Sequence, residues 1–255
     1  MSGSGHCLQL DVGNSRAKWR LLRDEHVVDR GNYRPDDEAS QAVLLDCAEH
    51  VEQIWIASVA ASATEDALAT LLQQRWGTTP WFARTAAQTG TLRNSYADPT
   101  RMGVDRWLAM LGARERLQGR LCVVDAGSAL TIDIVSAEGQ HEGGYIIPGP
   151  ALMERALLLD TDRVRFAEDV GYALSPGKST AEAVRHGIAL AQAGALALAL
   201  QQVGGEAMPL LFCGGAGETL MHLVQPPTGQ WAPDLVFEGL AAMAALQGQG
   251  VSGRV

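Results

Sequence analysis

The hydrophobic pattern of the first half of the chain predicts strands alternating with helices. Apolar residues recur at helical spacing over 37–51 and 62–76. Short apolar runs predict strands around these helices, at 8–10, 18–22, 27–30, 54–59 and 80–83. Strands followed by helix, strand, helix and strand are typical of an α/β domain.

The second half predicts a similar order of elements. An apolar run at 123–126 and a second at 130–134 predict a hairpin, and residues 143–147 predict a further strand closed by Pro148 and Gly149. A final strand is expected at 209–213, and helices are expected at 107–117, 151–159, 218–224 and 239–246. A long helix should begin after Ser179, beyond a polar connection at 160–168. We therefore expect two related α/β domains, at 1–117 and 118–255.

A short motif appears once in each half, which supports an internal duplication. The first copy is Asp11-Val-Gly13-Asn14-Ser15, and the second is Asp125-Ala-Gly127-Ser128. In each copy an apolar strand ends in Asp-x-Gly and apolar residues resume shortly afterwards. One copy alone would favour an ordinary hairpin, because Asp-x-Gly is common. Two copies almost half a chain apart favour a repeated functional loop.

Each Asp-x-Gly copy has the residue types of a phosphate-binding hairpin. We expect Gly13 and Gly127 to turn the backbone with positive φ, and the small residues that follow to offer N–H and hydroxyl donors to a phosphate. Lys18 could add positive charge to the first loop. A strand followed by Gly214-Gly-Ala-Gly217 is a weaker nucleotide signal, because it lacks the full dinucleotide fingerprint.

Composition narrows the possible partners and compartment. The net charge of −9 argues against nucleic acid as the main partner, because a basic face is needed to release counterions. The four cysteines have no zinc-like spacing and predict reduced core thiols, so we expect a cytoplasmic protein. The apolar helix at 188–200 is short and interrupted by Gln192 and Gly194, so we expect no membrane span.

The loop between the two halves carries further chemistry. It contains Tyr96 and Pro99, and then Gly103, Val104, Asp105 and Arg106 at the start of a helix. Asp105 could simply cap that helix, and Arg106 could be a solvated residue of its first turn. The nearby tyrosine, the glycine and the adjacent arginine shift the balance towards a functional site.

The segment at 171–179 imitates a P-loop but does not satisfy its spacing. Five residues, instead of four, separate Gly171 from Gly177-Lys178, and no apolar strand precedes them. Ser179 and Glu182 form a capping-box pattern instead. That box does not require the hydroxyl of Thr180.

Together these motifs resemble those of type III pantothenate kinase, in the order found in that family. Ser128 stands where threonine is expected, which is a mild departure because the hydroxyl is kept. The matching motifs are Asp11-x-Gly13-Asn14-Ser15-x-x-Lys18, Tyr96-x-x-Pro99 with Gly103-x-Asp105-Arg106, Asp125-x-Gly127-Ser128-x-x-Thr131-x-Asp133 and Gly143-Gly144-x-Ile146-x-Pro148-Gly149.

The resemblance implies an actin-like, sugar-kinase-like ATPase fold and ATP-dependent phosphorylation of pantothenate, the first step towards coenzyme A. It implies that Asp105 is the proton acceptor and that Asp125 holds a monovalent cation, K⁺ or NH₄⁺. Asp11 would lie near Mg²⁺ bound with ATP, and the family is homodimeric. ATP contacts would come from Asp11, Gly13, Asn14, Ser15, Lys18 and Ser128, and substrate contacts from Tyr96, Gly103, Val104, Asp105, Arg106 and Thr180.

Two other functions remain open from the residues. A sugar or acetate kinase of the same fold could carry both hairpins, but the loop at 96–106 argues against it. A non-catalytic nucleotide-binding regulator could keep the fold without turnover. The presence of Asp105 and Asp125 favours an enzyme.

Overall fold

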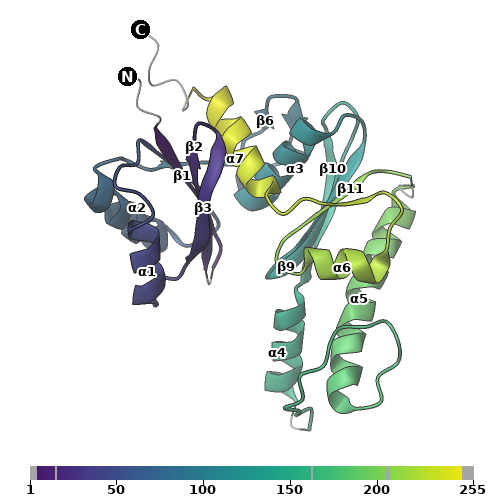
Figure 1. The fold of residues 1–255 in the computed structure, drawn as a ribbon. Coiled ribbons are helices and arrows are strands. Elements are labelled where there is room, and N and C mark those ends of the chain that lie inside the picture. The colour runs from purple at the N-terminus through teal and green to yellow at the C-terminus, as the bar shows by residue number, and fades with distance from the viewer. Residues whose placement is uncertain (1–4, 15, 162, 205–206, 249–255) are drawn as a thin grey trace. The chain divides into compact units, whose positions relative to one another are not determined.

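The computed structural model describes residues 5–14, 16–161, 163–204 and 207–248, which form two compact units (Figure 1). The first unit contains the described residues up to Gly90, Tyr96–Glu115 and those from Val236 onward. The second contains Thr91–Ser95 and Arg116–Leu235. The expected division at residue 117 therefore differs in two respects, because the C-terminal helix belongs to the first unit and Thr91–Ser95 belong to the second.

The first unit is built on a five-stranded sheet of order β3-β2-β1-β4-β5. β1 pairs antiparallel with β2 and parallel with β4. The bounds of its elements are β1 (His6–Val12), β2 (Ala17–Arg23), β3 (His26–Tyr33), α1 (Glu38–Leu45), β4 (Gln53–Ser58), α2 (Ser62–Trp76), β5 (Trp81–Phe82), β6 (Gln88–Thr89), the short 3₁₀ helix η1 (Pro99–Arg101), α3 (Val104–Arg116) and α7 (Leu235–Leu246).

Helices cover both faces of this sheet. On one face, apolar side chains of β1, β2 and β4 form a core with Leu44 of α1 and with Leu68 and Leu72 of α2. On the other face, the Arg20 guanidinium lies 4.8 Å from the centre of the Phe237 ring of α7. α3 packs closely on α7, because a Cβ at Gly239 would collide with the carbonyl of Leu108. These contacts explain why α7 joins the first unit.

The second unit has a five-stranded sheet of order β10-β9-β8-β11-β12. One sheet face forms a core with Leu196 and Ala199 of α5 and with Leu220 of α6. The bounds of its elements are β7 (Leu92–Arg93), β8 (Leu121–Ala126), β9 (Ala129–Val135), β10 (His141–Pro148), α4 (Pro150–Asp160), α5 (Thr180–Gln202), β11 (Leu210–Cys213), α6 (Gly217–Val224) and β12 (Gly229–Trp231).

The two sheets repeat the same topology. In each, the first strand pairs antiparallel with the second and parallel with the fourth, and the second pairs antiparallel with the third. β8 therefore corresponds to β1, and β11 corresponds to β4. The predicted α/β duplication is confirmed at the level of strand order.

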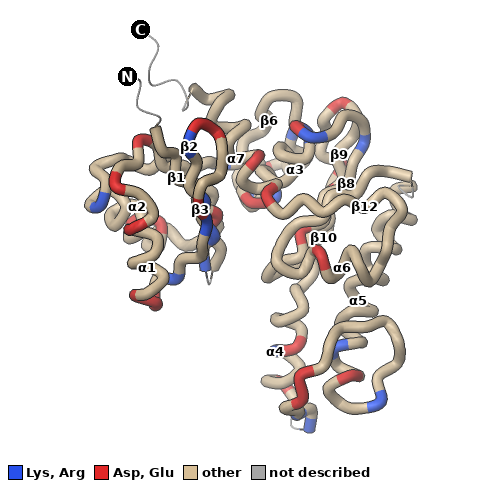
Figure 2. The backbone as a smooth tube through the Cα atoms, in the orientation of Figure 1, with Lys and Arg blue, Asp and Glu red and all other residues tan. Residues whose placement is uncertain are grey.

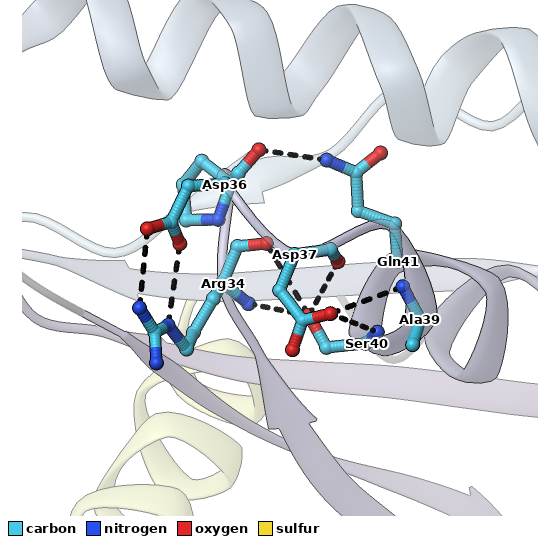
Figure 3. A network of polar contacts seen from close by, with 7 residues as sticks. Arg34, Asp36, Asp37, Ala39, Ser40 and Gln41 are labelled. Atoms are coloured by element: carbon cyan, nitrogen blue, oxygen red, sulfur yellow. Dashed lines mark hydrogen bonds and ion pairs between the residues drawn. The ribbon is translucent and has the colours of Figure 1, made fainter.

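The predicted elements are mostly confirmed, with differences at helix ends. The helix expected over 37–51 ends at Leu45. Its beginning is well defined, because the Asp37 carboxylate accepts hydrogen bonds from the backbone N–H groups of Ala39 and Ser40 (Figure 3). α2 has the predicted bounds, and its N-cap is Ala61, without a side-chain hydrogen bond.

Helix α5 is longer and more apolar than the sequence pattern suggested. By length and composition, Thr180–Gln202 is long and apolar enough to cross a membrane, and 33% of its most apolar stretch is buried. Core helices of soluble proteins can be equally long and apolar. Because Leu196 and Ala199 belong to the core of the second unit, part of the apolar surface of α5 is already used in packing.

Candidate active site

The first Asp-x-Gly loop joins β1 to β2 in the first unit. Asp11 lies at the end of β1, beside Ala57 of β4, and it is directly opposite Lys18 of β2. Side chains of directly opposed residues in an antiparallel pair share one face of the sheet. The structure therefore places a carboxylate and an ammonium group on the same face, next to the loop.

The loop after Asp11 is short and closed by a backbone bond. The N–H of Gly13 donates to the carbonyl of Arg16 at 3.0 Å. Asn14 follows with an exposed side chain. Ser15, the remaining expected ATP contact of this loop, lies outside the described residues.

The second loop joins β8 to β9 and is built in the same way. Asp125 lies opposite Thr131 of β9, and the N–H of Gly127 donates to the carbonyl of Ala129 at 2.8 Å. Ser128 lies exposed at the tip of the hairpin. Two hairpins of the same construction thus present Asp11 and Asp125 at equivalent positions of their sheets.

The expected positive φ at the loop glycines is wrong. Neither Gly13 nor Gly127 has a φ in the left-handed region. What these glycines provide is space, since a Cβ at Gly13 would lie 3.3 Å from the Arg16 carbonyl and a Cβ at Gly127 would lie 3.6 Å from Asp125 Oδ1. A side chain at Gly13 would therefore be tight against the loop backbone, whereas one at Gly127 would make an ordinary contact.

Two glycines from other motifs pack directly on the second loop. Gly149 donates its N–H to the Ser128 carbonyl at 3.0 Å, and a Cβ there would collide with the carbonyl oxygens of Gly127 and Ser128. Gly214 has a φ of 83°, and a Cβ there would collide with Asp125 Oδ1 and the Ala126 carbonyl. The glycine-rich turn after β11 therefore supports Asp125, a role that its sequence alone did not reveal.

The loop between the halves brings Tyr96 and Arg106 together in the first unit. Arg106 is only 5% exposed, so it is not the solvated first-turn residue that the alternative interpretation required. Its Nη1 donates to the Tyr96 hydroxyl at 2.9 Å, and its guanidinium carbon lies 5.8 Å from the centre of the tyrosine ring. A buried arginine fixed beside a phenol is suited to binding an anionic or polar ligand.

Asp105 lies within the first turn of α3 and is not its N-cap. The helix begins at Val104, and Asp105 Oδ1 accepts from the backbone N–H of Arg106 at 2.8 Å. A Cβ at Gly103 would lie 2.5 Å from that same oxygen, so glycine is needed for this approach. The structure thus places Gly103, Val104, Asp105 and Arg106 together at one helix start.

Thr180 begins α5 in the second unit, and its side chain is exposed. The predicted capping box is present in modified form. Ser179 Oγ accepts from the N–H of Glu182 at 3.2 Å, while the Glu182 carboxylate accepts from the N–H of Lys178 at 2.6 Å, not from that of Ser179. Thr180 is not needed for either bond and also lines a groove between α4 and α5.

In the part of the chain that the structure describes, the acidic side chains do not form a preassembled multi-carboxylate metal centre. Among the described residues, no group of three or more His, Cys, Asp or Glu side chains could hold a metal ion. Mg²⁺ commonly binds through one or two carboxylates together with water and phosphate oxygens, so a single Asp11 beside bound ATP fits that ion. Acidic residues occur next to basic ones in both units (Figure 2).

Comparison with known proteins identifies the family. A family model for type III pantothenate kinase matches residues 7–202. A type III pantothenate kinase of Ectopseudomonas mendocina (strain ymp) is 38% identical over 248 residues, which cover 94% of this chain and 99% of that protein. A type III pantothenate kinase of Alcanivorax borkumensis is 36% identical over 245 residues, with 94% and 99% covered.

Solved structures agree on the fold. A Campylobacter jejuni protein described as a Baf family transcriptional activator superposes with a TM-score of 0.59 at 21% identity, covering 95% of this chain and 99% of that one. The activator of 2-hydroxyisocaproyl-CoA dehydratase from Clostridium difficile, with bound ADPNP, superposes with a TM-score of 0.52 at 8% identity, covering 98% of each chain. These likenesses confirm the expected actin-like, sugar-kinase-like ATPase fold.

The matched residues include both Asp-x-Gly motifs, the loop at 96–106 and Thr180, and the relatives align along almost their whole length. The chain therefore belongs to the type III pantothenate kinase family.

Proposed function

We propose that this protein transfers the γ-phosphoryl group of ATP to the primary hydroxyl of pantothenate, giving 4'-phosphopantothenate, the first step of coenzyme A biosynthesis. The observation that carries the proposal is the start of α3. There a buried Arg106, bonded to Tyr96, lies next in sequence to Asp105. This arrangement provides a cation, a phenol and a carboxylate for a substrate that is an anion carrying hydroxyl groups.

We propose that Tyr96, Gly103, Val104, Asp105, Arg106 and Thr180 bind pantothenate. Arg106 would pair with the substrate carboxylate or its polar groups, because a guanidinium makes strong charge-assisted hydrogen bonds. Asp105 would accept the proton of the attacking hydroxyl. In the reaction the substrate oxygen forms a bond to the γ-phosphorus, the bond to the β–γ bridging oxygen breaks, and ADP leaves.

The ATP side of the site would come from both hairpins. Asp11, Gly13, Asn14, Ser15 and Lys18 are the proposed contacts of the first loop, and Ser128 is the proposed contact of the second. Phosphoryl transfer depends mainly on positioning and charge neutralisation. Lys18 supplies positive charge beside the first loop, while Asp11 would hold Mg²⁺ that neutralises the phosphate charge when ATP is bound.

We further propose that Asp125 holds a monovalent cation, K⁺ or NH₄⁺. Support comes from its position, since Gly214 packs directly against Oδ1, where a Cβ would collide with it and with the Ala126 carbonyl. Carboxylate and backbone carbonyl oxygens are the ligands that hard cations prefer. The cation would lie beside the second hairpin.

A homodimer is the proposed assembly, formed through α4 and α5. These helices line an apolar groove of about 730 Å³ that includes Leu152, Leu157 and Val184. Leu157 and Leu190 are 39% and 60% exposed. Large exposed apolar patches mark interaction sites, and the presence of Thr180 in the groove would bring a substrate contact to the subunit interface.

The cytoplasm is the proposed location, with neither membrane nor nucleic acid as a partner. The four cysteines are free thiols, as expected in a reducing compartment. Part of α5 packs into the core of the second unit, which accounts for apolar residues that a membrane span would otherwise explain.

The direct test is ADP formation with pantothenate as the acceptor. ADP should be quantified by chromatography, so that no coupling enzyme imposes its own cation requirement. We expect turnover with pantothenate, and more turnover in K⁺ than in Na⁺. Turnover with sugars or acetate in place of pantothenate would support the sugar or acetate kinase alternative, and nucleotide binding without turnover would support the regulator.

A further inference from the structure

A buried acid–histidine pair lies in the second unit, apart from the residues assigned above. Asp133 of β9 and His141 of β10 are 1% and 0% exposed, and His141 Nε2 lies 3.0 Å from Asp133 Oδ1. Burying an ionisable pair costs free energy through desolvation, so its presence calls for a structural or functional reason. Neither side chain has a role in the proposed phosphoryl transfer.

The other nitrogen of His141 contacts the segment at 91–95, which leads into the proposed substrate-binding loop at 96–106, called the substrate loop below. Ser95 Oγ lies 2.8 Å from His141 Nδ1. His141 is therefore held through both ring nitrogens, by the Asp133 carboxyl group at Nε2 and by the Ser95 hydroxyl at Nδ1. The carboxyl group orients the imidazole ring, and the ring in turn holds Ser95.

The same segment is held at further points by the turn between β9 and β10. The N–H of Arg93 donates to the Gly139 carbonyl at 2.9 Å, and Gln140 Nε2 donates to the Arg93 carbonyl at 3.4 Å. Gly139 has a φ of 86°, and a Cβ there would collide with the Thr91 carbonyl. Thr91 and Arg93 are therefore packed against this turn, and Ser95 is held by His141.

The next residue is Tyr96, whose hydroxyl is 2.9 Å from Arg106 Nη1. Adjacent Cα atoms are only about 3.8 Å apart, so the backbone conformation of Ser95 limits where the Tyr96 ring can lie. We infer that His141, oriented by Asp133, is a positioning residue for pantothenate binding, which it supports by holding Ser95 and thereby the start of the substrate loop. This inference rests on the proposed function.

The first test is Ser95→Ala, which removes an exposed hydroxyl and leaves the buried pair intact. Loss of one positioning hydrogen bond should raise the KM for pantothenate about 3- to 10-fold, with the KM for ATP and kcat changed by less than about twofold. Ser95→Thr keeps the hydroxyl and should restore most of the pantothenate KM. An unchanged pantothenate KM in Ser95→Ala would overturn the inference.

Ser136→Ala is the matched control. Ser136 lies in the same turn, and its hydroxyl bonds with Glu138 and Gln140 inside that turn. We expect this variant to keep the pantothenate KM of the parent protein. A rise equal to that in Ser95→Ala would mean that loosening the turn is sufficient, and would refute a specific role for the Ser95 to His141 contact.

Two further measurements make the test independent of one variant. Effects of Ser95→Ala and His141→Asn on the pantothenate KM should be non-additive, because both remove the same contact; additive effects would contradict the inference. Hydrogen exchange of residues 91–96 should become faster in Ser95→Ala but not in Ser136→Ala. Hydrogen exchange is measured without turnover, so unchanged exchange in Ser95→Ala would contradict the anchoring of Ser95 by His141. A parent protein that does not phosphorylate pantothenate would instead contradict the proposed function.

Discussion

Replacing Asp105 by Asn separates its role in α3 from its proposed role on the substrate. In the structure Asp105 Oδ1 accepts from the Arg106 N–H at 2.8 Å, and an asparagine oxygen can make the same bond. What changes is the charge at the N-terminus of the helix. A carboxylate in a first turn contributes about 0.3–1 kcal/mol to stability through the helix dipole.

That range sets the expected thermal effect. For a chain of this size, 1 kcal/mol shifts Tm by about 2–4 °C, so Asp105→Asn should lower Tm by at most about 4 °C. The effect on rate should be far larger. General-base catalysis supplies about 10²- to 10⁴-fold, and the loose transition state of phosphoryl transfer favours the lower end. We expect kcat to fall about 100-fold.

The assay is initial-rate ADP formation at saturating ATP and pantothenate, paired with thermal unfolding and ATP binding by calorimetry. Asp37→Asn is the matched control, because Asp37 caps α1 with two backbone hydrogen bonds and lies outside the proposed site (Figure 3). It should lose a similar amount of stability and no activity. Near-normal kcat in Asp105→Asn would refute the general-base role and leave Asp105 as a helix residue.

Three other outcomes are expected. Asp125→Ala should abolish the difference between K⁺ and Na⁺ buffers while leaving the circular dichroism spectrum unchanged; a persisting K⁺ effect would contradict the cation assignment. Val184→Lys, in the groove between α4 and α5, should convert a dimer into a monomer with weakened pantothenate binding, as measured by light scattering and calorimetry, whereas a monomeric parent protein with full activity would refute the proposed assembly. Burial raises the pKa of the Cys122 thiol to about 12 in the folded protein. In the unfolded chain the thiol ionises at about 8.5, so the unfolded state loses this proton first. The free energy of unfolding should therefore fall as the pH rises from about 9 to 12. Cys122→Ala should flatten that decline in urea titrations, and an unchanged slope would show that other groups cause it.

The sequence predicted the two hairpins well because their side-chain pattern is local. Asp11 and Asp125 each lie near the end of a buried strand and precede a tight connection, and both features can be read from neighbouring residues. The packing partner of α7 could not be predicted in this way. The apolar pattern of a helix predicts that it will be buried, but it does not identify the surface that buries it. For α7 that surface is shown by the contact of Phe237 with Arg20 and by the close approach of Gly239 to Leu108.

Contacts between distant residues were the main features that sequence reasoning missed. The Arg106 to Tyr96 bond spans a short loop and could be anticipated from the motif, whereas the contact of Ser95 with His141 joins residues far apart in the chain. A histidine at the first position of β10 was the available signal. Likewise, the role of Gly214 beside Asp125 depends on two parallel strands being neighbours, which local pattern does not encode.

The return of α7 to the first unit has a consequence for how the chain folds during synthesis. Ribosomes release the chain from its N-terminus, and domains generally fold as units as they emerge. The sheet of the first unit emerges early, but the helix whose Phe237 covers Arg20 follows the second unit in the chain. The second unit, whose residues end at Leu235, is complete before the first. The part of the protein that is translated first is therefore the part whose folding finishes last, and premature termination before α7 would leave the Arg20 face of its sheet exposed to chaperones and proteases.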